Sequence, residues 1–192
     1  MIEIKNDEDL RRVVAQVSEG LQAIQDYVGG NQRPDAKVRF PRGFIRTAEE
    51  IRRQLPAVGP DLHRRNISYA IIMNDLLRWL LLRTDIFGTA KGMVIKEAIC
   101  LMASLCETFT KDALAGKIGD NKGFKDRTAM LAKLQIIDAA LKKELDWLWD
   151  KRQNEHLFLA EQSEHEHYTA EDYNKAFRAY DGLREKLKAN FG

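Results

Sequence analysis

The sequence predicts an all-α protein, an up-and-down bundle of about five to six helices. Apolar residues recur at alternating steps of three and four along most of the chain, which is the period of a buried helix face. No segment of useful length alternates with the period of a strand. With 192 residues, 44% hydrophobic and 31% charged, the chain has the composition of one globular domain. We therefore expect residues 1–192 to form a single helical domain, with a first helix and a basic arm in residues 1–60 and a bundle in residues 61–192.

The first helix is predicted from a heptad-like apolar stripe that is followed directly by a stop signal. The two residues after the stripe are Gly29 and Gly30, which commonly end helices. The stripe consists of Leu10, Val14, Val17, Leu21, Ile24 and Val28.

A loop or arm and a short helix are predicted next. Residues 31–46 contain Pro34 and Pro41 and have no clear period, so they are expected to lack regular structure. Thr47 and Glu50 have the spacing of a capping box. The sequence therefore predicts a short helix that starts after Thr47 and ends before the next proline.

Four further helices are predicted for the bundle. Residues 61–84 are apolar nearly all round near Trp79, which is typical of a central helix or of one buried in a dimer. A helix over residues 89–114 ends before a group of glycines. The next runs from about residue 125 into residue 156, and its stripe is Leu134, Ile137, Leu141, Leu145 and Leu148. Thr169 is the predicted N-cap of the last helix, whose stripe is Tyr173, Phe177, Tyr180, Leu183 and Leu187.

The candidate functional site is the segment RQNEH, residues 152–156. Arg152 and His156 continue the stripe of their helix in steps of four, at positions where leucine is expected. A charge and a titratable ring directed towards the interior are costly unless they are paired, hydrated in a cleft or used for function. The structural alternative is a helix end where the arginine extends to solvent and the histidine caps carbonyl groups.

Charge is distributed unevenly, although the formal net charge is only +2. Residues 33–65 are rich in arginine, whereas residues 144–172 are acidic and would repel phosphate. An RNA-binding role would therefore take its positive potential from the basic segment. The residues predicted to bind RNA are Arg39, Arg42, Arg46, Arg64 and Arg65. A basic segment of this kind is more often a solvated surface or a subunit contact than a nucleic-acid-binding surface. For His63, which lies beside Arg64, phosphate contact is the only role suggested.

Several classes of protein are disfavoured by the sequence. Cys100 and Cys106 are six residues apart on a predicted helix and point in different directions, which predicts no disulfide and fits a reducing cytosol. No signal peptide and no membrane span are recognised, so a cytoplasmic protein without a membrane partner is expected. Glu164 and His167 have a spacing seen in di-iron bundles, but no second copy exists. No metal and no cofactor are expected.

The end of the chain resembles a known family. LDWLWDKRQNEHLFL (145–159), which follows two long helices and precedes YTAEDYNKAFRAYDGL (168–183), resembles the carboxy-terminal half of a HEPN domain. The HEPN signature is an arginine, usually followed by a polar residue, and a histidine after four to six intervening residues. The resemblance covers mainly residues 61–187, and Glu107 resembles the acidic residue that many members carry in a core helix. Here three residues separate Arg152 from His156, and the second motif position is glutamine, where asparagine or aspartate is commoner.

The resemblance implies a function. Active HEPN proteins are metal-independent endoribonucleases, often of toxin-antitoxin or phage-defence systems, and they act as homodimers with two motifs facing one cleft. It implies that His156 transfers protons, that Arg152 contacts phosphate oxygens and that Asn154 orients either group. RNA and a cognate antitoxin are the implied partners. The alternative is a non-catalytic helical interaction module whose cleft holds a protein or nucleotide partner.

Overall fold

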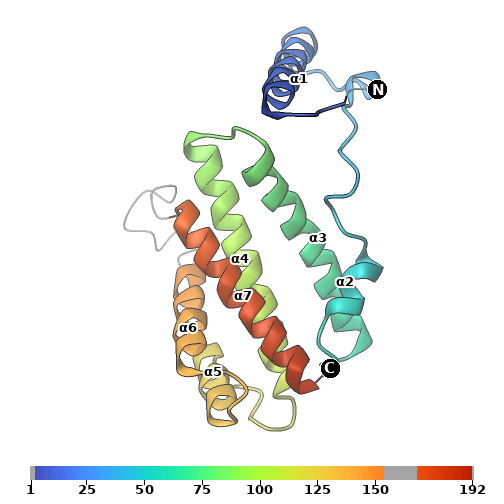
Figure 1. Ribbon diagram of the computed structural model, residues 1–192. Coiled ribbons are helices and arrows are strands. Elements are labelled where there is room, and N and C mark those ends of the chain that lie inside the picture. The colour runs from blue at the N-terminus through green and yellow to red at the C-terminus, as the bar shows by residue number, and fades with distance from the viewer. Residues whose placement is uncertain (1–2, 154–167, 192) are drawn as a thin grey trace. The chain divides into compact units, whose positions relative to one another are not determined.

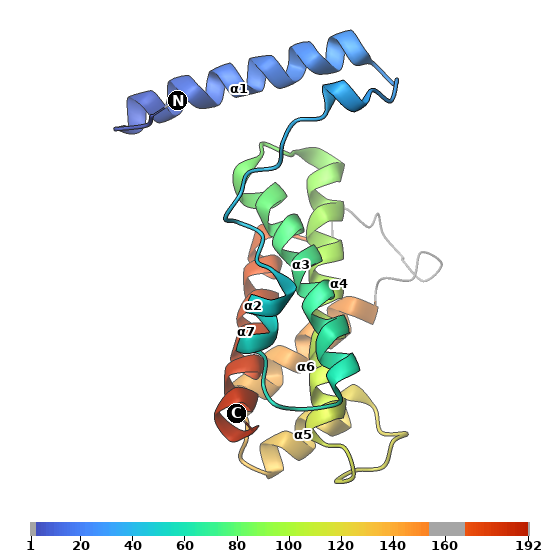
Figure 2. The ribbon, with the colours of Figure 1, turned by 90° about the vertical axis from the view of Figure 1, so that its right-hand side faces the viewer.

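The computed structural model describes residues 3–153 and 168–191, and all regular structure in these residues is helical (Figures 1 and 2). The prediction of an all-α bundle is confirmed. No helix of the described residues combines the length and the apolar character needed to cross a bilayer. The helices are α1 (Asp7–Val28), the 3₁₀ turn η1 (Pro34–Ala36), α2 (Ala48–Gln54), α3 (Asp61–Arg83), α4 (Gly88–Ala113), α5 (Phe124–Lys133), α6 (Ala139–Gln153) and α7 (Ala170–Phe191).

The chain divides into two compact units, residues 1–42 and residues 43–192. The first unit contains α1 and η1, and α1 has no buried residue. Residues 43–60 were expected to belong to the N-terminal arm, whereas the structure places them with the bundle. The reason is burial: Ile51, Leu55 and Val58 are at most 6% exposed and belong to the hydrophobic core.

The central helix of the second unit is α4, which contacts α3, α5, α6 and α7 (Figure 1). The prediction that residues 61–84 form the central helix is wrong. Helix α3 packs chiefly on α2 and α4, and it leaves Tyr69, Met73 and Leu82 more than half exposed. A nearly continuous apolar surface therefore did not indicate the centre of this bundle, and burial of α3 in a dimer stays a prediction.

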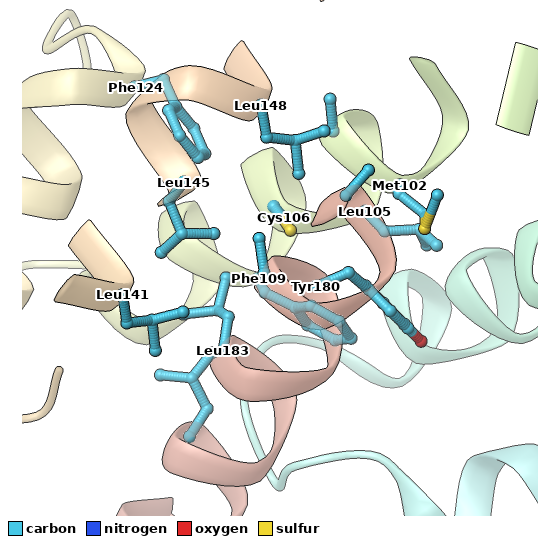
Figure 3. Packing of buried hydrophobic residues seen from close by; sticks show 14 of the residues in the cluster. Met102, Leu105, Cys106, Phe109, Phe124, Leu141, Leu145, Leu148, Tyr180 and Leu183 are labelled. Carbon is cyan, nitrogen blue, oxygen red and sulfur yellow. The ribbon is translucent and has the colours of Figure 1, made fainter. Parts of the chain in front are cut away.

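The core lies between α4, α6 and α7 (Figure 3). The rings of Phe109 and Tyr180 stack with centroids 6.4 Å apart. Cys106 is fully buried, and burial raises the pKa of its thiol. Both cysteines are free, so the prediction of no disulfide is confirmed. The residues that fill this region include Met102, Leu105, Cys106 and Phe109 of α4, Leu145 and Leu148 of α6, and Tyr180 and Leu183 of α7.

The predicted helix from residue 125 to residue 156 is interrupted, because α5 and α6 are separate helices. Gln135 adopts the left-handed conformation with φ of 57°. The N–H of Ile136 donates to the carbonyl of Leu131 at 3.0 Å, and the N–H of Gln135 donates to that of Ala132 at 2.9 Å. These two bonds are those of a Schellman motif, which ends α5. Asp138 then begins α6 by accepting a 2.8 Å bond from the backbone N–H three residues on.

Several predicted helix ends are confirmed. Gly29 follows α1 with φ of 58°. Thr47 and Glu50 form a complete capping box at the start of α2. Thr169 and Asp172 bond each other's backbone N–H groups at 3.1 Å before and within α7. At these ends the local sequence alone determines the structure, because each cap uses residues within three or four positions of one another.

Candidate functional site

Arg152 lies where the sequence placed it, one turn beyond Leu148 on the buried side of α6. Leu141, Leu145 and Leu148 are the buried residues of this helix, and the Arg152 side chain is 31% exposed. The arginine therefore stands at the edge of the core. Asn154 and His156 lie outside the described residues, and so do Glu164 and His167.

Aromatic rings orient the Arg152 guanidinium. Its carbon Cζ lies 4.8 Å from the centroid of the Trp149 ring. Trp149 in turn stacks on Phe124 of α5, with centroids 4.8 Å apart and planes 12° from parallel. The Cζ atom of Arg127 lies 6.0 Å from the Phe124 ring. Because cations are attracted to ring faces, this series of contacts restricts the orientation of both guanidinium groups.

Glu107 of α4 joins the two arginines. Its carboxylate lies 3.7 Å from Nη1 of Arg152, 3.5 Å from Nη2 of Arg127 and 2.9 Å from Nζ of Lys111. We call these four residues the Glu107 cluster. One carboxylate thus faces three cations, which leaves the cluster with an excess of positive charge. The acidic residue suggested by the HEPN resemblance is therefore a partner of the motif arginine.

Arg127 also belongs to the site, although it was not predicted from the sequence. It is 4% exposed, and its Nε donates to Oγ1 of Thr110 at 3.2 Å. Burial lowers the pKa of this guanidinium, and Glu107 acts in the opposite direction. A signal was present, because Arg127 lies three residues after Phe124 and four before Leu131, on the buried face of α5.

The Arg152 guanidinium retains hydrogen-bonding capacity. Its Nε atom is buried and has no hydrogen-bond partner among the described residues. The contact with Glu107 at 3.7 Å is an ion pair that is too long for a hydrogen bond. A buried donor without a partner is uncommon in folded proteins. An anionic group with planar or tetrahedral oxygen geometry would satisfy it, because a guanidinium presents several donors in a fixed fork.

The acidic stretch around Arg152 is partly neutralised by lysines of α5 and α6. The sequence suggested that this stretch repels phosphate. In the structure three of its carboxylates have lysine partners, and Asp146 also accepts a 2.7 Å bond from Thr128. Local repulsion of a phosphate is therefore weaker than the linear charge pattern indicates. The three pairs are Asp146 with Lys142 at 2.6 Å, Asp150 with Lys125 at 2.6 Å, and Asp172 with Lys151 at 3.2 Å.

A second basic feature lies between α2 and α3. Arg64 and Arg65, two of the residues predicted to bind RNA, line a hollow of about 330 Å³ together with Arg52 and Arg53. Two carboxylates, from residues 49 and 61, also line it. We call this hollow the basic cleft. Its four guanidinium groups against two carboxylates make it suited to phosphate.

Arg46 has a structural role. Its Nε and Nη2 atoms donate to the two carboxylate oxygens of Asp75 at 2.9 and 2.8 Å. Asp75 is buried, and the hydrogen bond to it raises the pKa of Arg46. This bidentate pair attaches the segment before α2 to α3. Arg39 and Arg42, the other predicted RNA-binding residues, are exposed and belong to the first unit.

His63 has an acidic partner that the sequence did not suggest. Its Nδ1 lies 2.9 Å from Oδ1 of Asp112, and both residues line a hollow of about 360 Å³ between α3 and α4. The other oxygen of Asp112 is buried without a hydrogen-bond partner among the described residues. Gly59, with φ of 76°, approaches so closely that a Cβ there would lie 2.1 Å from that oxygen.

The described residues contain no group of three or more histidine, cysteine, aspartate or glutamate side chains arranged to hold a metal ion. The chain matches no protein-family model, no curated protein and no solved structure. The interpretation of the site therefore depends on its own geometry. That geometry is a guanidinium with an unsatisfied donor, oriented by a ring and a carboxylate, and a separate cleft rich in arginine.

Proposed function

We propose that this chain is a cytoplasmic HEPN-like protein that binds RNA and cleaves it endonucleolytically without a metal, as a homodimer of toxin or phage-defence type. The observation that supports the proposal is the state of Arg152. Its guanidinium lies at the edge of the core, is oriented by Trp149 and Glu107, and keeps a buried Nε donor without a partner among the described residues. A phosphate group is the ligand that such a donor set recognises best.

The chemistry of the proposed reaction uses groups that the motif contains. A base removes the proton from an RNA 2′-hydroxyl, the 2′-oxygen attacks the adjacent phosphorus, and an acid protonates the departing 5′-oxygen. The products are a 2′,3′-cyclic phosphate and a 5′-hydroxyl. His156 is the proposed base or acid, since an imidazole titrates near neutral pH. Arg152 stabilises the charge on the phosphate oxygens, and Asn154 orients either group.

Two copies of the motif complete the proposed mechanism. A homodimer brings two histidines to one cleft, so one can act as the base and the other as the acid. The basic cleft, with Arg64 and Arg65, and the exposed Arg39 and Arg42 supply positive potential for the RNA backbone. A cognate antitoxin is the protein partner that such a nuclease would need in its own cell.

The test is cleavage of mixed RNA by the purified chain in the presence of a chelator. His156→Ala is expected to lower the rate at least about a hundredfold, the usual scale for loss of a general acid or base, with an unchanged circular dichroism spectrum. His165→Ala is the matched control and should retain the activity. If His63→Ala abolishes cleavage and His156→Ala does not, the proposed site is wrong.

Two substitutions of Arg152 test separately whether the charge and the planar shape of its guanidinium are needed. Arg152→Ala should reduce both RNA affinity and cleavage rate, and Arg152→Lys should not restore them, because an ammonium group cannot replace the guanidinium fork. Arg178→Ala, which removes an exposed arginine of α7, is the control. Full activity of Arg152→Lys would show that only the charge matters.

The second candidate function is a non-catalytic interaction module that binds a protein or nucleotide at the same cleft. The short spacing of the motif favours it. Intact RNA across a broad substrate set would support this function. Under the nuclease function, Arg65→Gln should lower RNA affinity and reduce its salt dependence by about one unit of slope, because the basic cleft loses one phosphate contact.

A further inference from the structure

Helix α1 presents a complete apolar seam to solvent. None of its residues is buried, and the side chains at the first five seam positions are between 40 and 55% exposed. The steps along the seam are four, three, four, three and four, which is the a/d pattern of a coiled coil rather than the wider stripe of a helix on a globular core. Because most of the stability of a protein helix comes from packing of its apolar face, we expect the exposed seam to bind a helical partner.

We propose that α1 pairs in antiparallel orientation with α1 of a second copy of this chain. The seam has the same spacing when read from either end, with its centre at position 19. Reversing one copy therefore aligns every seam residue with a seam residue of the other. The resulting layers are Leu10 with Val28, Val14 with Ile24, and Val17 with Leu21, each formed twice across the pair.

The residues beside the seam are compatible with this arrangement. In an antiparallel pair, each flanking position meets the same kind of position on the other helix. Val13 then meets Tyr27, Arg11 meets Gln25, and Gly20 meets its own copy. No two like charges face each other. A Cβ at Gly20 would have no neighbour within 4 Å in the single chain, so this part of the surface is open for close approach.

A hollow at the C-terminal end of α1 can accommodate the N-terminal end of α1 from the second copy. A hollow of about 420 Å³ is lined by Ile24, Val28 and Val38 of the first unit. Antiparallel pairing brings Leu10 of the second copy to Val28, at the edge of this hollow. Arg33, which is paired with Asp35, and Lys37 also line it.

Charge favours the antiparallel orientation and this class of partner. Helix α1 begins with Asp7, Glu8 and Asp9, and the antiparallel arrangement places these acids near Arg33 and Lys37 of the second copy. A parallel arrangement would instead bring the two acidic ends together. The helix also lacks the basic polar face that binds anionic membranes or nucleic acid. The pairing does not depend on the proposed nuclease function.

The first test is the oligomeric state of the full chain by sedimentation velocity over a range of concentrations. The wild-type chain should be a dimer, and Leu21→Glu should weaken the dimer at least a hundredfold. Gln22→Glu adds the same charge one residue away from the seam and should leave the dimer intact. Because Leu21→Glu could also melt α1, a second variant, Val17→Ala with Leu21→Ala, removes seam volume while favouring the helix and should weaken the dimer as well.

The second test determines orientation. Leu10→Cys and Val28→Cys are prepared as separate full-length chains, and the native cysteines are buried in the bundle. On mild oxidation, a mixture of the two variants should give disulfide-linked dimers, whereas each variant alone should not. Cross-linking of each variant with itself, a monomeric wild-type chain, or an undiminished dimer in both seam variants would overturn the proposal. RNA cleavage is not used as a readout, so failure here is separate from failure of the proposed function.

Discussion

At the scale of single residues, Glu107 accounts for much of the candidate site. Its carboxylate faces Lys111, Arg127 and Arg152, which come from α4, α5 and α6. A carboxylate shared among three cations positions them but does not neutralise them. The arginine of the motif is therefore held in place and still available for an anion, which is the property that the proposed function requires.

Arg46 shows how the same residue type can serve stability. The sequence grouped it with the arginines predicted to bind RNA, because it lies in the basic segment. In the structure it forms a bidentate pair with buried Asp75. Breaking such a pair leaves a buried charge without its partner, which commonly costs several kcal/mol. Loss of RNA binding on substitution of Arg46 would therefore need to be separated from loss of folded protein.

Tyr180 provides a prediction for alkaline pH. Burial raises the pKa of its hydroxyl from 10.0 to about 12. Below pH 10 the hydroxyl is protonated in both states, and its contribution is fully present. Between pH 10 and 12 the unfolded chain loses this proton and the folded chain keeps it, so the free energy of unfolding falls by about 1.4 kcal/mol for each pH unit. Above pH 12 the contribution has been lost.

Tyr180→Phe removes this contribution. In urea unfolding at pH 9, 10 and 11, we expect the variant to lose less stability than the wild-type chain between pH 10 and 11, by about 1 kcal/mol. Tyr69→Phe, at an exposed tyrosine, is the control and should behave like the wild-type chain. An equal loss of unfolding free energy between pH 10 and 11 in all three chains would contradict the raised pKa of Tyr180.

At the scale of elements, the turn between α5 and α6 decides where the motif helix begins. The sequence predicts one continuous helix because the apolar period crosses the turn and no glycine or proline interrupts it. The structure ends α5 with a Schellman motif whose left-handed residue is Gln135. Packing of Ile136, which is 8% exposed, compensates for the cost of the left-handed backbone at Gln135. A hydrophobic contact of the residue at this position commonly accompanies the Schellman motif.

Gln135→Gly should stabilise the protein by about 0.5–1 kcal/mol. A side chain in the left-handed region costs about 1–2 kcal/mol, and the greater freedom of glycine in the unfolded chain removes part of the gain. Urea unfolding at neutral pH measures the difference. Gln135→Ala retains a Cβ and should show little change. A destabilised glycine variant would mean that contacts of the Gln135 side chain outweigh the backbone term.

Helix ends and helix order were predictable to different degrees. The Thr47 and Thr169 caps and the Gly29 stop were recognised because each uses neighbouring residues. The central position of α4, in place of α3, was not predictable. An amphipathic pattern indicates how much of a helix is buried, and it does not indicate which other helix covers it. Arg152 was found from the stripe of α6, whereas Arg127 and the Asp112 partner of His63 required the packing of other helices.

At the scale of the whole molecule, stability and the α1 seam belong to different parts of the chain. Every buried hydrophobic residue among those described lies in the second unit, from Ile51 onward. The first unit has instead an exposed seam on α1. Folding of the bundle and association through α1 should therefore be separable.

A chain that begins at Gly43 is expected to fold with a free energy of unfolding within about 1 kcal/mol of the full chain, measured for both under monomeric conditions. Trp79, Trp147 and Trp149 all lie in the retained part, so urea unfolding can be followed by their fluorescence. A loss of several kcal/mol would show that residues 1–42 support the core. Sedimentation of the same chain should show loss of the dimer that we assign to α1.

The sequence by itself determined the all-α class, the stripes and caps of most helices, the seam of α1 and the position of Arg152. These properties depend on residues close together in the chain, whose spacing is set by helix geometry. Only the tertiary structure decided that α4 is central, that α5 and α6 are separate, and that Glu107 and Trp149 hold Arg152. The physical reason is that contacts between distant segments depend on how the helices fill space together, and helical periodicity does not record them.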